Sequence, residues 1–438
     1  MKNFCLLIFL LLGGNTLWAQ AELLQSGPML GYAEMREVLL WVQTTEPATV
    51  QFEYWEEDKP KVIHKTTKVQ THKDQAFTAK LIADEVEPGT TYTYQLRING
   101  KKIDRPYPTT FQTQPLWQWR TDPPPFKMAV GSCAYTNEPK YDRPGTPYGG
   151  QNKMYETINA KQPDAMLWLG DNIYLREVDW FTRTGILHRY TEFRKIPELQ
   201  ALLASTNHYA IWDDHDFGPN NSDRSFIHKD KTLEAFKLFW GNPTYGVNRE
   251  PGITSFFQYR DIDFFLLDNR YHRSPNDRKS GEATIMGENQ LEWLIDALVN
   301  SAAPFKMVAI GGQVLNTSAT FENYANRYAE ERQYLLNRIA EEGITGVIFL
   351  TGDRHATELS TYVNSAGNVV YDLTVSPLTS GPANNKAEDN RMRVPNTYVA
   401  QRNFGILDFS GPKDKRQLKI QIYDVDGKEL WNRVILAE

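Results

Sequence analysis

The stretch Asp164-Ala-Met-Leu-Trp-Leu-Gly-Asp-Asn-Ile-Tyr174 decides the fold class, because it reads as a buried strand that ends abruptly in polar residues. Other short apolar runs end in the same way, at Gly131-Ser132-Cys133, Trp212-Asp213-Asp214-His215-Asp216, Asp268-Asn269-Arg270 and Gly352-Asp353-Arg354-His355. Amphipathic segments typical of helices, such as 287–299 and 328–342, lie between the runs. Apolar strands that alternate with helices predict a layered α/β domain, which we place at residues 126–438, with further strands from Asn403 onward.

Upstream of this domain the pattern changes to short strands. Residues 38–42, 49–55, 75–81 and 91–98 are apolar or alternate with period two, and turn residues such as Glu87-Pro88-Gly89 separate them. This pattern predicts an all-β sandwich over residues 22–120. Residues 86–94 resemble the fibronectin type III pattern, in which a tyrosine fixes the corner after a turn. We find no catalytic cluster here and expect a packing or substrate-presenting module, joined by a stiff linker at 121–125.

The first residues predict export. Lys2 precedes a short apolar run over residues 4–12, and Ala19-Gln20-Ala21 fits a cleavage site. We therefore expect residues 1–21 to be a cleaved signal peptide and the protein to be secreted or periplasmic. No later apolar run is long enough to span a membrane. The net charge of −6 disfavours a nonspecific nucleic-acid binder, so we expect no stable nucleic-acid complex, and we expect a monomer.

Cysteine usage leaves two interpretations open. The chain has Cys5 and Cys133, and Cys5 would leave with the signal peptide. A single thiol in an exported protein is either a small buried hydrophobic residue or a metal-bound thiolate.

The strand ends predict one shared site, because open α/β sheets bind ligands at the carboxyl ends of their strands. Asp213 or Asp268 alone would be read as a turn or helix cap, but turns need neither Cys, Tyr nor His. Several carboxylates held together repel one another unless cations compensate them. Carboxylates suit hard cations such as calcium or ferric iron, while thiolate and imidazole suit transition metals. The residues therefore predict a mixed site; the paired Cys spacings of a structural zinc site are absent.

In combination, these strand-end motifs, with Asn220-Asn221 downstream, resemble the alkaline phosphatase D (PhoD-like) family of the calcineurin-like metallophosphoesterases. The resemblance covers nearly the whole mature chain, since that family also carries an N-terminal β-sandwich. It implies a layered catalytic domain with sheets sandwiched by helices, and a secreted enzyme that hydrolyses phosphate monoesters or diesters with Fe3+ and Ca2+. The metal ligands that it implies are Cys133, Asp171, Tyr174, Asp214, Asp353 and His355.

The resemblance also assigns roles. Cys133, Tyr174 and His355 would bind iron, Asp171 would bridge the metals, and Asp214 would bind the second metal. His215 would contact the phosphate or protonate the leaving oxygen. Gln313 stands where the wider superfamily has a histidine, which favours oxygen ligands and hence calcium; whether Gln313 itself touches metal stays open.

The implied mechanism is in-line attack of a metal-bound hydroxide on the phosphorus of a phosphate ester substrate. His215, oriented by Asp216, would donate a proton to the departing alkoxide. Arg270 and Arg354 are candidates for stabilising the phosphoryl oxygens, and each is equally a candidate for a structural ion pair. Residues 376–386 are either a loop near the site or a plain turn. We expect structural rather than site roles for the remaining histidines, which lie in the polar β region or lack a ligand spacing: His64, His72, His188, His208, His228 and His272.

A second class of function is a surface-interaction protein whose sandwich binds a partner while the α/β domain is inert. The many charges gathered at the strand ends argue against it, because an inert scaffold gains nothing from holding them together.

Overall fold

The computed structural model describes residues 23–319 and 323–438, so the predicted signal peptide at 1–21 lies outside the described residues. The chain separates into two units: one runs to Leu116 and includes Arg194–Asn207, and the other comprises Trp117–Phe193 and His208–Glu438. Within the described residues, helices that combine the length and the apolar character needed to cross a membrane are absent.

The first unit is a β-sandwich. Its strands are β1 (Leu24–Ala33), β2 (Val38–Thr44), β3 (Thr49–Glu56), β4 (His64–Lys65), β5 (Val69–Gln70), β6 (Thr78–Ala83), β7 (Thr91–Ile98), β8 (Lys101–Lys102) and β9 (Thr110–Gln112), with the short helices η1 (Lys73–Gln75), η2 (Pro197–Leu199) and α4 (Gln200–Ser205). β2 pairs with β1 and β6, whereas β3 pairs with β4, β5 and β7. Both sets bury side chains in one core, which includes Leu40, Phe52 and Tyr94. Tyr92 Oη accepts a hydrogen bond from the Glu87 N–H (2.8 Å), which confirms a tyrosine at the corner.

The second unit contains two mixed sheets. One has the order β21 (Glu429–Leu436), β20 (Gln417–Asp424), β19 (Asn403–Ser410), β10 (Phe126–Gly131), β11 (Ala165–Leu169) and β12 (Asn207–Ile211). The other has the order β13 (Ser255–Tyr259), β14 (Ile262–Leu266), β15 (Lys306–Ala309), β16 (Val347–Thr351), β18 (Val369–Thr374) and β17 (Glu358–Val363). The sheets pack face to face. On the first sheet the ring centres of Phe126 and Phe409 lie 4.6 Å apart, and the ring centre of Phe264, on the second sheet, lies 6.4 Å from that of Phe409.

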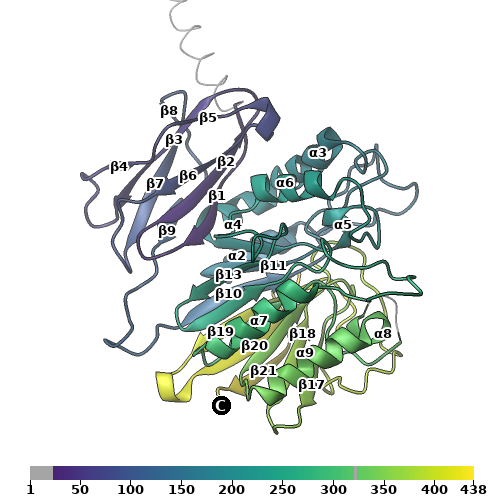
Figure 1. Cartoon of the computed structure of the whole chain (residues 1–438). Helices are drawn as coiled ribbons and strands as arrows, with labels where there is room; N and C mark the ends of the chain where they lie inside the picture. The colour runs from purple at the N-terminus through teal and green to yellow at the C-terminus, as the bar shows by residue number, and fades with distance from the viewer. Residues whose placement is uncertain (1–22, 320–322) are drawn as a thin grey trace, which may run out of the picture. The chain divides into compact units, whose positions relative to one another are not determined.

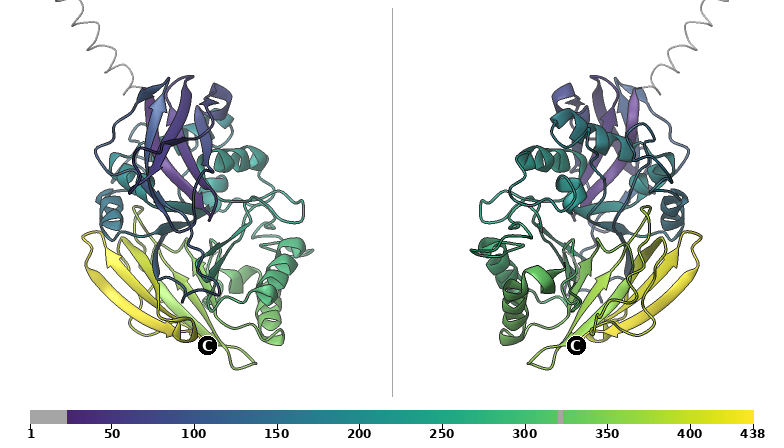
Figure 2. Two further views of the ribbon diagram at one scale, coloured as in Figure 1. Left: turned by 90° about the vertical axis from the view of Figure 1, so that its left-hand side faces the viewer. Right: turned by 90° about the vertical axis from the view of Figure 1, so that its right-hand side faces the viewer.

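Helices cover these sheets on the outside. α7 (Glu288–Asn300) and α9 (Ala329–Glu341) lie beside the second sheet, as Figure 1 shows. They bury Leu294, Leu298 and Ile339 in the core that they share with this sheet. Figure 2 shows the C-terminal strands and these two helices on opposite sides of the unit. The remaining helices are α2 (Lys153–Ala160), α3 (Arg183–Arg194), α5 (Asp214–Phe217), α6 (Lys229–Phe239), α8 (Tyr324–Arg327) and η3 (Lys413–Lys415). Helices outside two stacked sheets confirm the layered α/β prediction.

The proline-rich linker is held in place rather than free. Arg416, which is 1% exposed, donates hydrogen bonds to the carbonyl oxygens of Pro123 (3.2 Å) and Pro124 (2.9 Å). A buried guanidinium thus satisfies backbone oxygens that a proline-rich segment cannot pair in a helix or sheet.

Candidate metal centre

The predicted strand-end residues meet at one edge of the two sheets in the second unit. Cys133 follows β10, Asp171 follows β11, Asp213 and Asp214 follow β12, and Asp353 follows β16. Backbone hydrogen bonds join these ends, including Cys133 N–H to Gly170 O (3.2 Å) and Gly352 N–H to Gly311 O (2.7 Å). We call the following residues the strand-end cluster: Cys133, Asp171, Tyr174, Asp213, Asp214, His215, Asp353 and His355.

The backbone of the cluster is strained. Cys133, Asp171, Asp353 and His355 all have positive φ, between 51° and 66°. Non-glycine residues rarely adopt this region, and each such residue costs about 1–3 kcal/mol. Residues outside the cluster, such as Phe77 and Arg249, also have positive φ, but in the cluster the conformation falls on residues that carry chemistry, as expected where function rather than stability selects it.

Gly170 makes the close approach of two strand ends possible. It has φ +91°, and a Cβ there would lie 2.8 Å from Asp213 Cβ and 2.9 Å from the Trp212 carbonyl carbon. We expect Gly170→Ala to lower the free energy of unfolding by about 3 kcal/mol, from the left-handed backbone and from overpacking. Denaturant unfolding measures this, with Gly343→Ala as the matched control.

Gly343 follows α9 with φ +63° and has no heavy atom within 4 Å of the ideal Cβ. Its substitution should therefore cost only the backbone component, about 1–2 kcal/mol. Equal losses in both variants would contradict the close-approach explanation.

The first group of ligand atoms comes from Cys133, Asp171 and His355. The Cys133 Sγ lies 3.7 Å from Asp171 Oδ2, and the Tyr174 hydroxyl lies 3.2 Å from both that oxygen and His355 Nε2. His355 Nδ1 lies 2.6 Å from the Gly381 carbonyl oxygen, so Nδ1 must carry the proton. In the neutral ring Nε2 is then left with its lone pair for a metal, the usual arrangement of a ligating histidine.

Two further groups share Asp214. One combines it with Asp171 and His215, and the other with Asp213 and Asp353. Asp214 Oδ2 accepts the Asn221 N–H (2.6 Å), while Oδ1 accepts no hydrogen bond from the described residues and has Arg270 as an ion-pair partner at 3.9 Å. Because Asp171 belongs to two groups, its two oxygens can serve two neighbouring cations.

The electrostatics of the cluster call for cations. Burial, followed by the charges of Asp214, Cys133 and Asp213, raises the pKa of Asp171 well above its usual value. Burial also raises the pKa of the Cys133 thiol and, with the Asp171 charge, that of the Tyr174 phenol. Burial opposes ionisation of Asp214, but His215, Arg270 and the Asn221 N–H outweigh it and lower the pKa. Thiol, phenol, imidazole and carboxylates around a buried centre fit a transition ion beside a hard ion.

Asp216 has a different role from the predicted one. Its carboxylate oxygens accept backbone N–H bonds from Asn172 (3.1 Å), Ile173 (3.3 Å) and Asp213 (3.0 Å), and not from the His215 ring. Asp216 therefore joins the ends of β11 and β12 and caps α5 in a capping box. The prediction that it orients His215 is corrected accordingly.

The two candidate arginines are both engaged in ion pairs. The Arg270 Nε contacts Asp213 Oδ1 at short range, and Arg270 is 1% exposed. Arg354 donates to Glu388 (2.5 Å). Of the two predicted roles, Arg354 thus has the structural ion pair. Arg270 contacts Asp213 and Asp214 and so lies at the strand-end cluster.

Gln313 is occupied by other partners. Its amide group donates to Glu358 (2.9 Å) and Thr374 (2.8 Å), and its oxygen accepts from Asn316 (2.7 Å).

The loop at 376–386 lies at the site. Ser376 Oγ is 3.1 Å from Cys133 Sγ and accepts the His355 N–H (2.9 Å), while Gly381 holds the His355 ring. The first of the two interpretations of this segment is therefore confirmed. His208 has the expected structural role, since it accepts the buried Trp168 indole N–H (2.9 Å).

Sequence reasoning missed two features. Asp213, read alone as a cap, offers an oxygen beside Asp214 and Asp353. Glu138, His188 and Glu192 form another group of potential ligands, which the i, i+4 spacing of His188 and Glu192 on α3 could have indicated. His188 and Arg189 both pair with Glu138 (3.2 and 2.9 Å), which explains this group as an ion-pair network.

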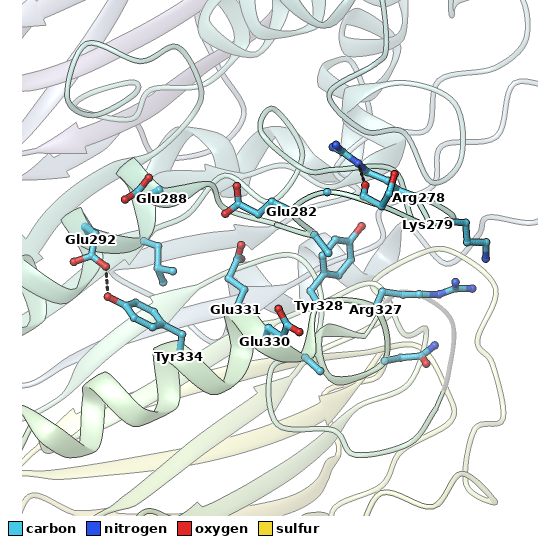
Figure 3. A pocket seen from close by; sticks show the side chains of 16 residues that line it. Arg278, Lys279, Glu282, Glu288, Glu292, Arg327, Tyr328, Glu330, Glu331 and Tyr334 are labelled. Atoms are coloured by element: carbon cyan, nitrogen blue, oxygen red, sulfur yellow. Dashed lines mark hydrogen bonds between the residues drawn. The ribbon is translucent and has the colours of Figure 1, made fainter.

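A cavity of about 540 Å³ opens beside the strand-end cluster and is lined in part by Tyr174 and His215. Another cavity, of about 740 Å³, lies between the start of α7 and the start of α9, and Figure 3 shows that charged side chains such as Arg278, Glu282 and Glu331 line it. The second cavity contains none of the strand-end cluster, so we take the first as the candidate substrate pocket.

Comparisons with known proteins agree with this geometry. The family described as PhoD-like phosphatase matches residues 128–411, and a domain of unknown function (DUF7800) matches residues 21–116. Alkaline phosphatase D of Bacillus subtilis (strain 168) is 22% identical over 348 residues, which cover 68% of this chain and 56% of that protein. The chain thus aligns with little more than half the length of this curated relative.

Solved structures show the same fold. A structure of PhoD superposes with a TM-score of 0.76 at 16% identity, covering 95% of this chain and 93% of that one. A purple acid phosphatase from yellow lupin (Lupinus luteus) seeds superposes with a TM-score of 0.66 at 13% identity, covering 93% of this chain and 74% of that one. These matches confirm the predicted layered α/β architecture with its N-terminal all-β region.

Proposed function

The chain belongs to the PhoD-like phosphatase family, and on that premise we propose that it is an exported, metal-dependent phosphoesterase that hydrolyses phosphate monoesters or diesters. The observation that supports this most strongly is the meeting of Cys133, Tyr174 and His355 around Asp171, from strand ends far apart in the sequence. In this proposal residues 126–438 form the catalytic domain, residues 22–120 form a packing or substrate-presenting sandwich, and residues 1–21 are removed on export.

The proposed cofactors are Fe3+ and Ca2+. Cys133, Tyr174 and His355, with Asp171, offer the thiolate, phenolate and imidazole that suit ferric iron. Asp214 with Asp213, Asp353 and the second oxygen of Asp171 offers the carboxylates that suit calcium. When bound, such cations would supply an activated water and neutralise charge on the phosphoryl oxygens.

The chain's own residues would position the ester and handle its protons. The His215 ring packs against the Tyr174 ring at a tilt of 32°, with 4.3 Å between ring centres, and both line the pocket beside the cluster. Arg270, held by Asp213, brings a buried guanidinium to the carboxylate end of the cluster and would meet phosphoryl oxygens there. Arg354 is proposed only as a support for the loop that holds Glu388.

Proton donation by His215 can be tested through its dependence on pH. Burial lowers the pKa of His215 below its usual value of 6.5, so the protonated ring disappears as pH rises through this lowered pKa. We expect His215→Ala to lower kcat/KM by about 10²–10⁴-fold. At pH values below the His215 pKa, kcat/KM should fall further for an alkyl phosphate than for 4-nitrophenyl phosphate, because only the alkoxide needs a proton as it leaves. A preference that persists unchanged at alkaline pH would contradict this assignment.

The proposed function is tested by metal analysis together with turnover of 4-nitrophenyl phosphate and bis(4-nitrophenyl) phosphate. We expect bound iron and calcium, a visible charge-transfer band from thiolate or phenolate on ferric iron, and turnover that a chelator abolishes and added metal restores. A protein that binds no metal and turns over neither ester would instead support the surface-interaction alternative.

A further inference from the structure

The candidate substrate pocket is walled by the two loops that follow the ligand-bearing strands. Tyr135, Tyr141 and Tyr148 come from the loop after β10, and Trp180 comes from the loop after β11. Each wall is therefore continuous in sequence with a residue of the strand-end cluster, Cys133 in the first case and Tyr174 in the second. This continuity sets the position of the aromatic walls relative to the reacting centre.

Arg176 ties the two walls together. It is 5% exposed and donates hydrogen bonds to two residues of the other loop, the Thr136 carbonyl oxygen (2.6 Å) and Asp142 (2.8 Å). Asp142 also accepts the Tyr135 hydroxyl (3.0 Å). The walls are thus braced by a buried ion pair before any ligand enters, which lowers the entropy cost of binding between them.

The polar atoms of Trp180 and Tyr148 already have hydrogen-bonding neighbours within the protein. The Trp180 indole N–H donates to the Leu175 carbonyl oxygen (3.1 Å), and the Tyr148 hydroxyl lies 3.0 Å from His355 Nδ1. Trp180 is nevertheless partly exposed and Tyr148 is 45% exposed. What these side chains can offer a ligand is therefore ring surface, which suits stacking against a planar group.

The charges in the pocket argue against a cationic group. The Arg176 guanidinium already covers the Tyr135 ring, with its central carbon 4.0 Å from the ring centre. Asp142 forms a buried ion pair with Arg176 (2.8 Å), and Glu177 is an exposed side chain that lies 3.9 Å from Arg143. The ring faces of Tyr135 and Tyr141 that Arg176 and Lys140 cover are closed to any ligand. A quaternary ammonium would in addition meet no carboxylate without a cationic neighbour in this lining, whereas a neutral planar ring needs no counter-charge.

We propose that this pocket binds a planar aromatic group of the substrate, such as a nucleobase, and that the preferred substrates are phosphoric esters of nucleosides. This specificity rests on the proposed phosphoesterase function. Trp180 is the specificity-determining residue in it, because its indole is the largest aromatic ring of the lining and is fixed at one edge by the Leu175 carbonyl oxygen.

The test compares thymidine 5′-phosphate with 2-deoxyribose 5-phosphate, and the methyl ester of each, using the metal-loaded full-length protein. Within each pair the phosphoryl group is bonded to the same primary C5 oxygen of the sugar, and the base is replaced by a hydroxyl group at C1. We expect kcat/KM to be about tenfold higher with the base, as typical of base–aromatic stacking, and Trp180→Ala to remove most of this ratio. Trp119→Ala is the matched control, since Trp119 is 98% exposed and outside the pocket lining, and it should leave the ratio unchanged.

Three outcomes overturn the proposal, and they are distinguishable. Hydrolysis of both members of a pair at equal kcat/KM overturns the specificity and leaves the phosphoesterase function standing. Phosphocholine as the better substrate would show that the aromatic walls bind a cation instead. No hydrolysis of any ester by metal-loaded protein overturns the function and the specificity together. Should Trp180→Ala fail to fold, competitive inhibition of the wild-type protein by thymidine but not by 2-deoxyribose supports the proposal, and equal inhibition contradicts it.

Discussion

Replacing Asp171 by asparagine is expected to lower kcat/KM for phosphate esters by at least about a thousandfold, equal to about 4 kcal/mol of transition-state stabilisation. Asp171 is the residue that joins the Cys133–His355 group to the Asp214–His215 group, so its loss weakens both. Steady-state kinetics together with metal content measure the effect, and both should fall.

The same substitution should leave the metal-free fold intact or raise its melting temperature. The pKa of Asp171 is raised well above its usual value because burial and neighbouring charges oppose its ionisation. The asparagine amide has nearly the same shape and carries no ionisable proton, so the cost of ionising a buried carboxyl group disappears. Its oxygen can still accept the backbone N–H of His215. Asp164→Asn is the matched control: Asp164 accepts the Lys127 N–H outside the cluster, and its loss should leave activity unchanged.

If Asp171→Asn retains metal and most of its activity, the bridging role is wrong. If it loses activity because it unfolds, the electrostatic explanation of the cluster is wrong, since that explanation requires a fold at least as stable as the metal-free wild type.

Removing the metals from the wild-type protein is expected to make its stability fall as pH rises. Because the pKa of Asp171 is raised in the folded protein, the folded carboxyl group keeps its proton at pH values above 3.8, the usual pKa, where the unfolded chain has released it. Because the unfolded state then binds fewer protons, the free energy of unfolding falls with pH across this window. Asp216, whose pKa burial raises to about 8, acts in the same direction. Asp214, with a lowered pKa, contributes only at pH values below its usual one.

Metal binding should show the opposite trend. Metals require deprotonated ligands, so the stabilisation that they confer grows with pH. We expect the difference in melting temperature between metal-loaded and chelated protein to widen from about pH 5 to about pH 8, and the decline of the chelated form to be shallower in Asp171→Asn. A difference that is constant or shrinks with pH would contradict the placement of cations at Asp171.

Local patterns in the sequence were sufficient for several of the elements and for most of the cluster, although the predicted strand 75–81 begins only at Thr78, after the short helix η1. The apolar run 165–169 became β11, and the amphipathic segments 287–299 and 328–342 became α7 and α9, within a residue or two at each end. Burial of one face dictates such periodicity, so it is visible without neighbours. The residues after the strands could be assembled in advance because parallel strands bring their carboxyl ends to one edge.

The partners of each side chain were decided only by the tertiary structure. Three aspartates that are neighbours in the sequence have different partners. Asp216 accepts backbone N–H groups, and Asp213 pairs with Arg270. Asp214 has one carboxylate oxygen that accepts no hydrogen bond from the described residues. Likewise Arg354 turns to Glu388, and Arg194–Asn207 packs with the first unit although it lies inside the second in sequence. Sequence specifies which groups reach the edge of a sheet through local periodicity, whereas their pairing depends on distances between segments far apart along the chain, which no local pattern encodes.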